Sequence, residues 1–181
     1  KITETLSTKY FPTSQFEHDF SNEEFKELKY LFEAVAGEIE PILPSGRYDV
    51  DSYLGQGKIA GVPWIGIRST KPDFDATPRN GFYLTILWKY DGSGVCLSFQ
   101  KGTDGIQGGN KALRIKTAVN LIREKYGTGE FETTINLGYN TGRPKAYQQA
   151  HITGREYDIS NLADLQNDLL RIENLYGLKQ D

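Results

Sequence analysis

The first third of the chain carries an apolar pattern with the spacing of one helix face. The residues on this face are Phe25, Leu28, Leu31, Phe32 and Val35. They follow Ser21-Asn22-Glu23-Glu24, which has the form of a capping box, where the serine hydroxyl and a glutamate carboxylate satisfy backbone N–H groups at a helix start. The pattern predicts a helix that begins near Ser21 and ends at Gly37 or Pro41.

The middle of the chain changes to the alternation and the β-branched and aromatic content of strands. We expect strands at residues 48–53, 64–67, 81–90 and 95–100. Asp91-Gly92 is a hairpin signal between the last two strands, and the prolines and polar residues of 69–80 predict a loop. Strands joined in this way form an antiparallel meander, not a β-α-β unit.

The last third returns to helical spacing. We expect an amphipathic helix at residues 110–126 and one or two short strands within 128–154, separated by a loop at 138–144. The apolar face of the first of these helices is formed by Leu113, Thr117, Val119, Leu121, Ile122 and Tyr126. A last helix follows, capped by Asp158 or Ser160, and its apolar face is formed by Ile159, Leu162, Leu165, Leu169, Ile172 and Leu175. This order predicts an α+β fold with a mixed, mainly antiparallel β-sheet flanked by helices.

Length and charge limit the classes of function. The chain has 181 residues, which is one domain's worth, so we expect a single domain over 1–181. Its net charge of −3 argues against a protein that holds nucleic acid through bulk electrostatics, because that mode needs many cations against phosphates. Any binding to DNA must therefore use a local basic patch.

The cysteine, methionine and apolar content indicate the cellular context. A single cysteine, Cys96, excludes an intrachain disulfide and is typical of a reducing compartment. No apolar run approaches the roughly 20 residues that a membrane helix needs, and the first residues lack a signal-peptide core. We therefore expect a cytoplasmic protein without a membrane partner. The lack of methionine, even at position 1, indicates a fragment of a larger polypeptide.

One region combines several less common motifs. It contains the G-x-G turn at Gly55 and Gly57, V-P-W-I at 62–65, G-F-Y-L at 81–84, and a strand that ends at Lys101-Gly102. In this order and spacing, with a closing helix, the region resembles the N-terminal DNA-binding domain of the McrB family of methylation-dependent restriction systems. The resemblance implies a DNA reader and not a catalyst, with double-stranded DNA carrying a modified base as its partner. It also implies that the base is flipped out of the duplex into a pocket.

The resemblance carries pocket positions onto Trp64, Tyr83 and Leu87. Flat side chains suit this role because a flipped base recovers part of its unstacking cost by stacking on them. Gln56 stands inside the G-x-G turn, where the family is expected to have an aromatic residue. Because glutamine can pair with an adenine edge, both methylcytosine and methyladenine remain open as the base. Tyr147 or Tyr139 is expected to add another wall.

Phosphate contacts are expected from basic residues near this pocket. The candidates are Lys58, Arg68, Lys71, Arg79, Arg143 and Lys145. The alternative interpretation is a solvated surface, in which Asp73 and Asp75 balance these charges.

Enzymatic interpretations have less support. Asp49 and Asp51, with Glu24, Glu38 or Glu40, would be the ligands of a metal-dependent nuclease, but the sequence places no lysine at a diagnostic spacing. His18 and His151 are isolated, and the phosphate-loop motif G-x-x-x-x-G-K-[ST] is missing. We expect no catalytic residue, metal or cofactor here. Any nuclease or NTPase motor then belongs to another domain or subunit. A protein-interaction or scaffold domain, with its aromatic residues in the core, is the remaining alternative.

Overall fold

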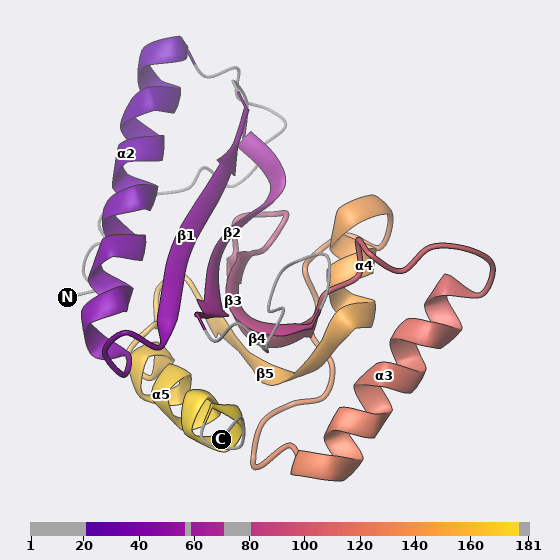
Figure 1. Cartoon of the computed structure of the whole chain (residues 1–181). Coiled ribbons are helices and arrows are strands. Elements are labelled where there is room, and N and C mark those ends of the chain that lie inside the picture. Colours follow the sequence, from indigo (N-terminus) through magenta and orange to yellow (C-terminus); the bar gives the residue numbers. More distant parts are fainter. Residues whose placement is uncertain (1–20, 57–58, 71–80, 178–181) are drawn as a thin grey trace.

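The structure is a computed structural model that describes residues 21–56, 59–70 and 81–177. Its centre is a strongly curved five-stranded sheet with helices on both sides (Figure 1). The strands are β1 (Tyr48–Gly55), β2 (Ile59–Ser69), β3 (Phe82–Trp88), β4 (Gly94–Lys101) and β5 (His151–Asp158). They lie side by side in sequence order, and every neighbouring pair is antiparallel. The predicted α+β class is confirmed.

The β3–β4 hairpin closes where the sequence predicted it. Gly92 takes a φ of 72°, a left-handed conformation that glycine adopts without the steric cost of a side chain. Its N–H donates to the Lys89 carbonyl at 3.0 Å, and the Asp91 carboxylate accepts from the Ser93 backbone N–H at 3.0 Å. Asp91-Gly92 therefore supplies both the turn geometry and its side-chain support.

One face of the sheet packs in the main hydrophobic core and is covered by α2 (Asn22–Ile39) and α5 (Leu165–Tyr176), as Figure 1 shows. The capping box at Ser21 is present, and α2 ends at Ile39, between the two predicted stops. The helix then continues as a single 3₁₀ turn, η1 (Glu40–Ile42), which contains Pro41. The centre of this core is formed by Phe32, Ile39, Ile65, Ile67, Leu84, Ile86, Leu97, Leu169 and Ile172.

The other face of the sheet is covered by α4 (Gly142–Ala150), with α3 (Lys111–Tyr126) beside it (Figure 1). A second, smaller apolar cluster lies here, against which Trp64 and Tyr147 pack. Its buried members are Val62, Leu87, Cys96, Ile135 and Leu137. Because it fills only part of this face, polar and aromatic side chains occupy the remainder.

Two predicted boundaries are wrong. The loop expected at 138–144 ends at Thr141, because α4 begins at Gly142. Of the one or two short strands expected within 128–154, one forms, β5 from His151, and before it Glu132 makes only an isolated bridge to Gly154. Pro144 lies in the first turn of the helix, where its missing N–H has no intrahelical partner to lose. The last helix starts at Leu165, because Asp158 instead closes a turn by accepting from the Ser160 N–H at 2.9 Å.

The buried face of α3 also differs from the prediction. Leu113 and Leu121 are 60% and 59% exposed, whereas Ile115 and Val119 are buried. The apolar residues of this helix form two stripes, and the stripe that contains Ile115 and Val119 turns toward the core. Helical spacing alone did not distinguish the two stripes.

A buried chain of polar side chains fastens α4 to the sheet. The Gln100 amide on β4 donates to the Ser98 hydroxyl at 2.7 Å and to the Tyr147 carbonyl of α4 at 3.1 Å. Ser98 lies 2.6 Å from Nδ1 of His151, and Nε2 of His151 lies 3.1 Å from the Glu132 carbonyl. A carbonyl only accepts, so Nε2 carries the proton, and Nδ1 of the neutral ring accepts from Ser98. The position of Tyr147 thus depends on a neutral, buried histidine.

This network predicts that the fold loses stability in mild acid. Burial lowers the pKa of His151 to about 4, whereas the unfolded chain has the ordinary value near 6.5. The unfolded chain therefore binds a proton first as the pH falls, so stability is full above pH 6.5 and is lost down to pH 4. Linkage gives a loss of about 2 kcal/mol between pH 7.5 and pH 5.

The test compares denaturant unfolding at pH 7.5 and pH 5 for the parent and for His151→Gln. We expect the variant to be less stable at pH 7.5 but to lose less free energy of unfolding on acidification. The difference between the two proteins isolates His151 from the carboxylates that also titrate in this range. Equal losses in both proteins would contradict the assignment.

Candidate functional site

A hollow on the α4 side of the sheet is created by small residues on two neighbouring strands. Gly66 of β2 pairs with Thr85 of β3. Thr85 turns its hydroxyl into the sheet, where it donates to the Ile65 carbonyl at 2.9 Å. A Cβ atom at Gly66 would lie 2.9 Å from Asp51 Oδ1 and 3.1 Å from Trp64 Cζ3. The Trp64 ring and the Asp51 carboxylate can therefore approach the floor only because residue 66 is glycine.

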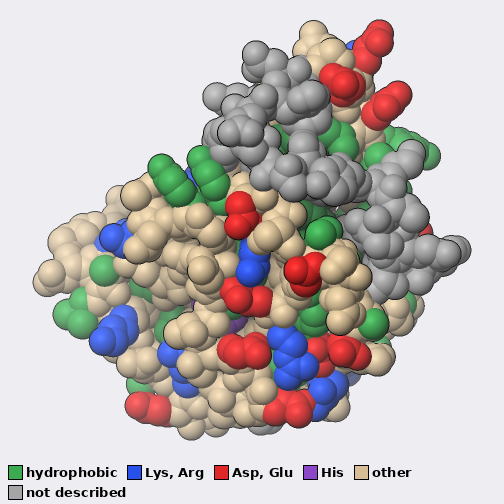
Figure 2. Space-filling view, turned by 180° about the vertical axis from the view of Figure 1, so that it is seen from behind, with side chains coloured by type: hydrophobic (Ala, Val, Ile, Leu, Met, Phe, Trp, Pro, Cys, Tyr) green, Lys and Arg blue, Asp and Glu red, His purple; other side chains and the backbone are tan. Residues whose placement is uncertain are grey.

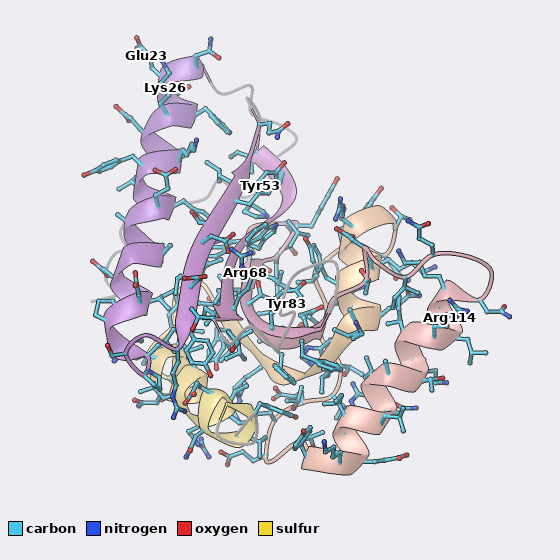
Figure 3. All side chains as sticks on the ribbon, viewed as in Figure 1. Glu23, Lys26, Tyr53, Arg68, Tyr83 and Arg114 are labelled. Atoms are coloured by element: carbon cyan, nitrogen blue, oxygen red, sulfur yellow. The ribbon has the colours of Figure 1, made fainter. Side chains whose placement is uncertain are left out.

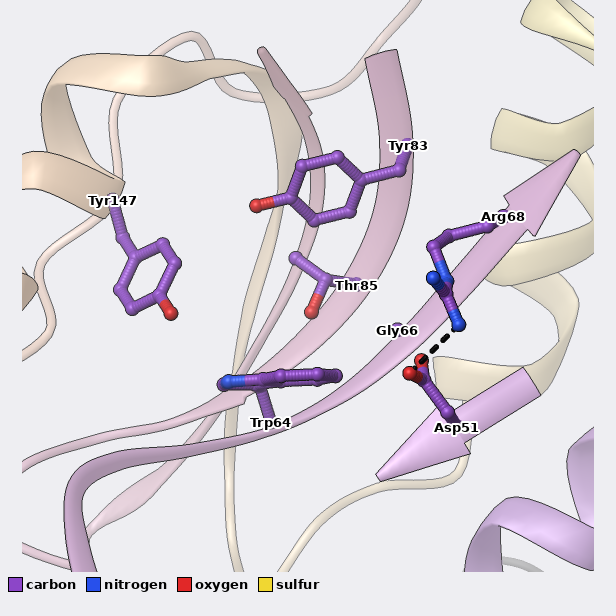
Figure 4. Close-up of a pocket in the computed structure, with 7 residues that line it drawn as sticks. All are labelled: Asp51, Trp64, Gly66, Arg68, Tyr83, Thr85 and Tyr147. Atoms are coloured by element: carbon purple, nitrogen blue, oxygen red, sulfur yellow. Dashed lines mark hydrogen bonds and ion pairs between the residues drawn. The ribbon is translucent and has the colours of Figure 1, made fainter. Parts of the chain in front are cut away.

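Three aromatic side chains stand around this floor (Figure 4). Trp64 comes from β2, Tyr83 from β3 and Tyr147 from α4. The hollow that they line encloses about 250 Å³, counting the part that is open to solvent. Most of that volume is open to solvent: the enclosed space is about 10 Å³, which is room for about one water molecule, so a planar ligand can enter only if the wall side chains move apart.

Each of these rings is held from behind. Tyr83 is only 7% exposed, and Trp64 stacks against Tyr53 of β1 with ring centroids 5.7 Å apart. Trp64 and Tyr147 also pack on the second apolar cluster. Burial raises the pKa of both the Tyr83 and the Tyr147 hydroxyl, so each stays protonated and able to donate at neutral pH.

An ion pair forms one edge of the hollow. Nη2 of Arg68 on β2 donates to Oδ2 of Asp51 on β1 at 2.8 Å, as the dashed line in Figure 4 shows. Within the described part of the chain, the buried atoms Asp51 Oδ1 and Arg68 Nε have no hydrogen-bond partner. Burial raises the pKa of Asp51, and the Arg68 guanidinium opposes that rise. This edge therefore offers one unsatisfied acceptor and one unsatisfied donor.

A second, more exposed pair lies toward α4. Arg143 Nη1 is 3.6 Å from Asp104 Oδ1, and the Arg143 side chain is 71% exposed. Burial raises the pKa of Tyr147, and the positive charge of Arg143 opposes that rise, so Arg143 interacts with a wall of the hollow. Lys145, two residues after Arg143 on α4, is also exposed.

The structure brings some of the predicted site residues together and separates others. Trp64, Tyr83 and Tyr147 line one hollow, whereas Leu87 is buried in the cluster beneath it. Gln56 is exposed at the bend after β1 and is not part of this lining. Tyr139, the alternative wall, instead stacks on Tyr90 with ring centroids 4.4 Å apart.

The predicted basic residues also lie in different places. Arg68 lines the hollow in an ion pair, and Arg143 and Lys145 are exposed on α4. Lys58, Lys71 and Arg79 lie outside the described residues.

Asp51, Gly66 and Thr85 were not predicted as parts of one site. The sequence contained one usable signal, a glycine between the large residues Trp64 and Arg68 at a strand period of two. The pairing of Asp51 with Gly66 depends on the β1–β2 register, which becomes irregular after Tyr53.

The metal-nuclease alternative has no support in the described residues. Among them, no group of three His, Cys, Asp or Glu side chains is placed to hold a metal ion. Asp51 is engaged with Arg68, and Glu24 closes the capping box on α2. A membrane helix is likewise not found among the described helices, since none is both long and apolar enough.

Comparison with known proteins gives a family and no curated relative. No curated protein matches the chain. The family model described as the MrcB-like, N-terminal domain matches residues 7–178. This confirms the resemblance drawn from the motifs between Gly55 and Gly102. Because the match covers almost the whole chain, the protein belongs to the MrcB-like N-terminal domain family.

Proposed function

We propose that this domain binds double-stranded DNA carrying a modified base and takes that base, flipped out of the duplex, into the hollow between Trp64, Tyr83 and Tyr147. It would serve as the specificity module of a modification-dependent restriction system. The family indicates a role in modified-DNA recognition and a specificity module, not a catalytic domain. The observation that carries the proposal is the set of three aromatic walls around a floor of Gly66 and Thr85.

The chemistry of flipping matches these walls. A base inside a duplex is not accessible to a pocket, so it must leave the stack at a cost of a few kcal/mol. Each aromatic contact returns roughly 1–3 kcal/mol by stacking. The three walls come from β2, β3 and α4, so a planar ligand in the hollow could contact more than one aromatic ring.

The walls are supported by neighbouring side chains, which limits the number of arrangements they can take when they move apart to admit a base. Trp64 is backed by Tyr53, and Tyr147 is held on α4 through the Gln100 and Ser98 network. A base entering the hollow therefore meets side chains whose positions are already restricted.

Contacts to the DNA backbone would come from local cations. On the face seen in Figure 2, the described Lys and Arg side chains are interspersed with Asp and Glu and make no continuous basic surface. Arg143 and Lys145 lie on the helix that supplies Tyr147, which suits phosphates flanking a flipped base. Lys58, Lys71 and Arg79 remain part of this proposal from the sequence.

Cleavage would then depend on a nuclease or motor carried by another domain or subunit. The chain itself would supply recognition in a restriction context, which the family implies.

The first prediction concerns the aromatic walls. Trp64→Ala and Tyr147→Ala should each weaken binding to the preferred modified duplex about ten- to a hundredfold, because each removes a stacking surface. Plain duplex should be affected much less. The measurement is a binding titration across matched duplexes with 5-methylcytosine, 5-hydroxymethylcytosine, N6-methyladenine or no modification.

Tyr139→Ala is the matched control, because Tyr139 is an exposed, stacked tyrosine that does not line the hollow. It should leave the preference unchanged. A parent protein that binds all duplexes equally would favour the scaffold alternative. A fluorescent base analogue at the modified position reports flipping directly.

The second prediction concerns the floor. Gly66→Ala adds one methyl group that would crowd Asp51 and Trp64, so the hollow must narrow or its walls must shift. We expect a loss of at least tenfold in affinity for modified duplex, with little change for plain duplex. Gly37→Ala is the control, because a Cβ atom there meets nothing within 4 Å. An unchanged preference in the Gly66 variant would place the base elsewhere.

The third prediction concerns contacts to the phosphate backbone of the DNA. Arg143→Gln combined with Lys145→Gln should weaken plain and modified duplexes by similar factors. The slope of log K against log salt should fall by up to about 2, since each phosphate contact contributes about 0.9.

Lys26→Gln with Lys29→Gln is the charge-matched control. These lysines lie on α2, across the sheet from α4, and Figure 3 shows Lys26 far from Tyr83. If the α2 pair changes the salt slope and the α4 pair does not, DNA approaches from the other side.

A further inference from the structure

The polar edge of the hollow contains an acceptor that the fold leaves unused. Oδ2 of Asp51 is held by Arg68, but Oδ1 is buried and has no hydrogen-bond partner among the described residues. Oδ1 lies over Gly66 at the floor, since a Cβ atom there would be 2.9 Å away. Figure 4 shows the carboxylate and Trp64 beside the same open space.

A buried, unsatisfied carboxylate oxygen costs free energy unless something pairs with it. Rotation of the side chain cannot relieve this without breaking the bond between Oδ2 and Arg68. Arg68, which also lines the hollow, has a buried Nε without a hydrogen-bond partner among the described residues, so this edge contains both an unused acceptor and an unused donor. A ligand that presents a donor next to an acceptor would satisfy both.

We propose that Asp51 accepts a hydrogen bond from the exocyclic amine of the flipped base, with Arg68 as the positioning residue, so that the pocket selects amino-bearing bases over thymine- and uracil-type bases. This inference rests on the function proposed above. Cytosine carries its N4 amine beside the N3 acceptor, and adenine carries its N6 amine beside ring nitrogens. A thymine or uracil derivative held in the same orientation places its O4 carbonyl oxygen at that position, which a carboxylate repels, and its N3–H donor reaches Asp51 only if the whole base shifts in the hollow.

The Asp51–Arg68 pair can distinguish one base from another, which the aromatic rings cannot do. Every base has a π-face, so stacking on Trp64, Tyr83 and Tyr147 is tolerant of base identity. When the wrong base offers no donor, the Asp51 carboxylate stays buried and unpaired, and this lowers the affinity for that base. Base identity would then be read at the Asp51 edge.

The experiment uses the whole chain and four duplexes of one sequence. They carry 5-methylcytosine, 5-hydroxymethylcytosine, N6-methyladenine or 5-hydroxymethyluracil at one position. The parent should bind at least one amino-bearing duplex ten times more tightly than the 5-hydroxymethyluracil duplex. Asp51→Asn keeps the shape but replaces an acceptor by an amide that can donate. Its affinity for the preferred duplex should fall about ten- to a hundredfold, and its discrimination against 5-hydroxymethyluracil should disappear.

Asp164→Asn is the control, because it makes the same change of charge at an exposed position just before α5, on the other side of the sheet from the hollow. It should leave discrimination intact. A second measurement needs no variant: the parent is titrated with a duplex whose preferred base lacks only its exocyclic amine. That duplex should bind about as weakly to the parent as the intact one binds to Asp51→Asn.

The outcomes separate the two proposals. If the parent prefers no modified duplex, the proposed function fails and this inference fails with it. If the parent prefers a modified duplex but tolerates both Asp51→Asn and the loss of the amine, only this inference is overturned. If Asp51→Asn does not fold, the amine-free base decides alone, and equal affinity for the two duplexes overturns the proposal.

Discussion

The pairing of Gly66 with Thr85 across β2 and β3 is the constraint on which the site depends. Alternation along a strand places residue 66 on the same face as Trp64 and Arg68, and residue 85 on the same face as Tyr83. Gly66 and Thr85 are small and lie opposite each other, so they leave a gap among the larger Trp64, Arg68, Tyr83 and Leu87. A slip of one residue in register would turn this gap toward the main hydrophobic core and expose Ile65 and Ile67. The core on the α2 side therefore fixes the hollow on the α4 side.

The wall that comes from α4 needs a separate constraint, because a nine-residue helix with a weakly apolar face does not hold its own position. Gln100 bonds to the Tyr147 carbonyl, and Ser98 and His151 bond in turn to Gln100 and to the Glu132 carbonyl. A satisfied polar chain specifies one arrangement more narrowly than apolar contacts do, and it is costly to disturb.

The features that the sequence predicted correctly are those that depend on a few neighbouring residues. The Ser21 capping box and the Asp91-Gly92 turn act over a few residues, and both form as expected. Helix α4 was missed because Gly138 to Pro144 reads as turn chemistry, while its contacts come from distant strands. Trp64 and Tyr83 were predicted as neighbours through the family resemblance. Asp51 was not predicted to lie with them. Its position over Gly66 depends on how β1 pairs with β2, and that register cannot be read from either strand alone.

The register also changes the role of Arg68. From the sequence it was grouped with cations for phosphate, but its partner Asp51 lies seventeen residues away and half-buried beside the hollow. With side chains 31% and 42% exposed, this ion pair contributes little to the stability of the fold. Its buried, unpaired Oδ1 and Nε atoms subtract from that contribution. Because the Asp51–Arg68 pair does little for the fold and lies beside three aromatic side chains, its place in the structure is the reason for proposing that it contacts a base.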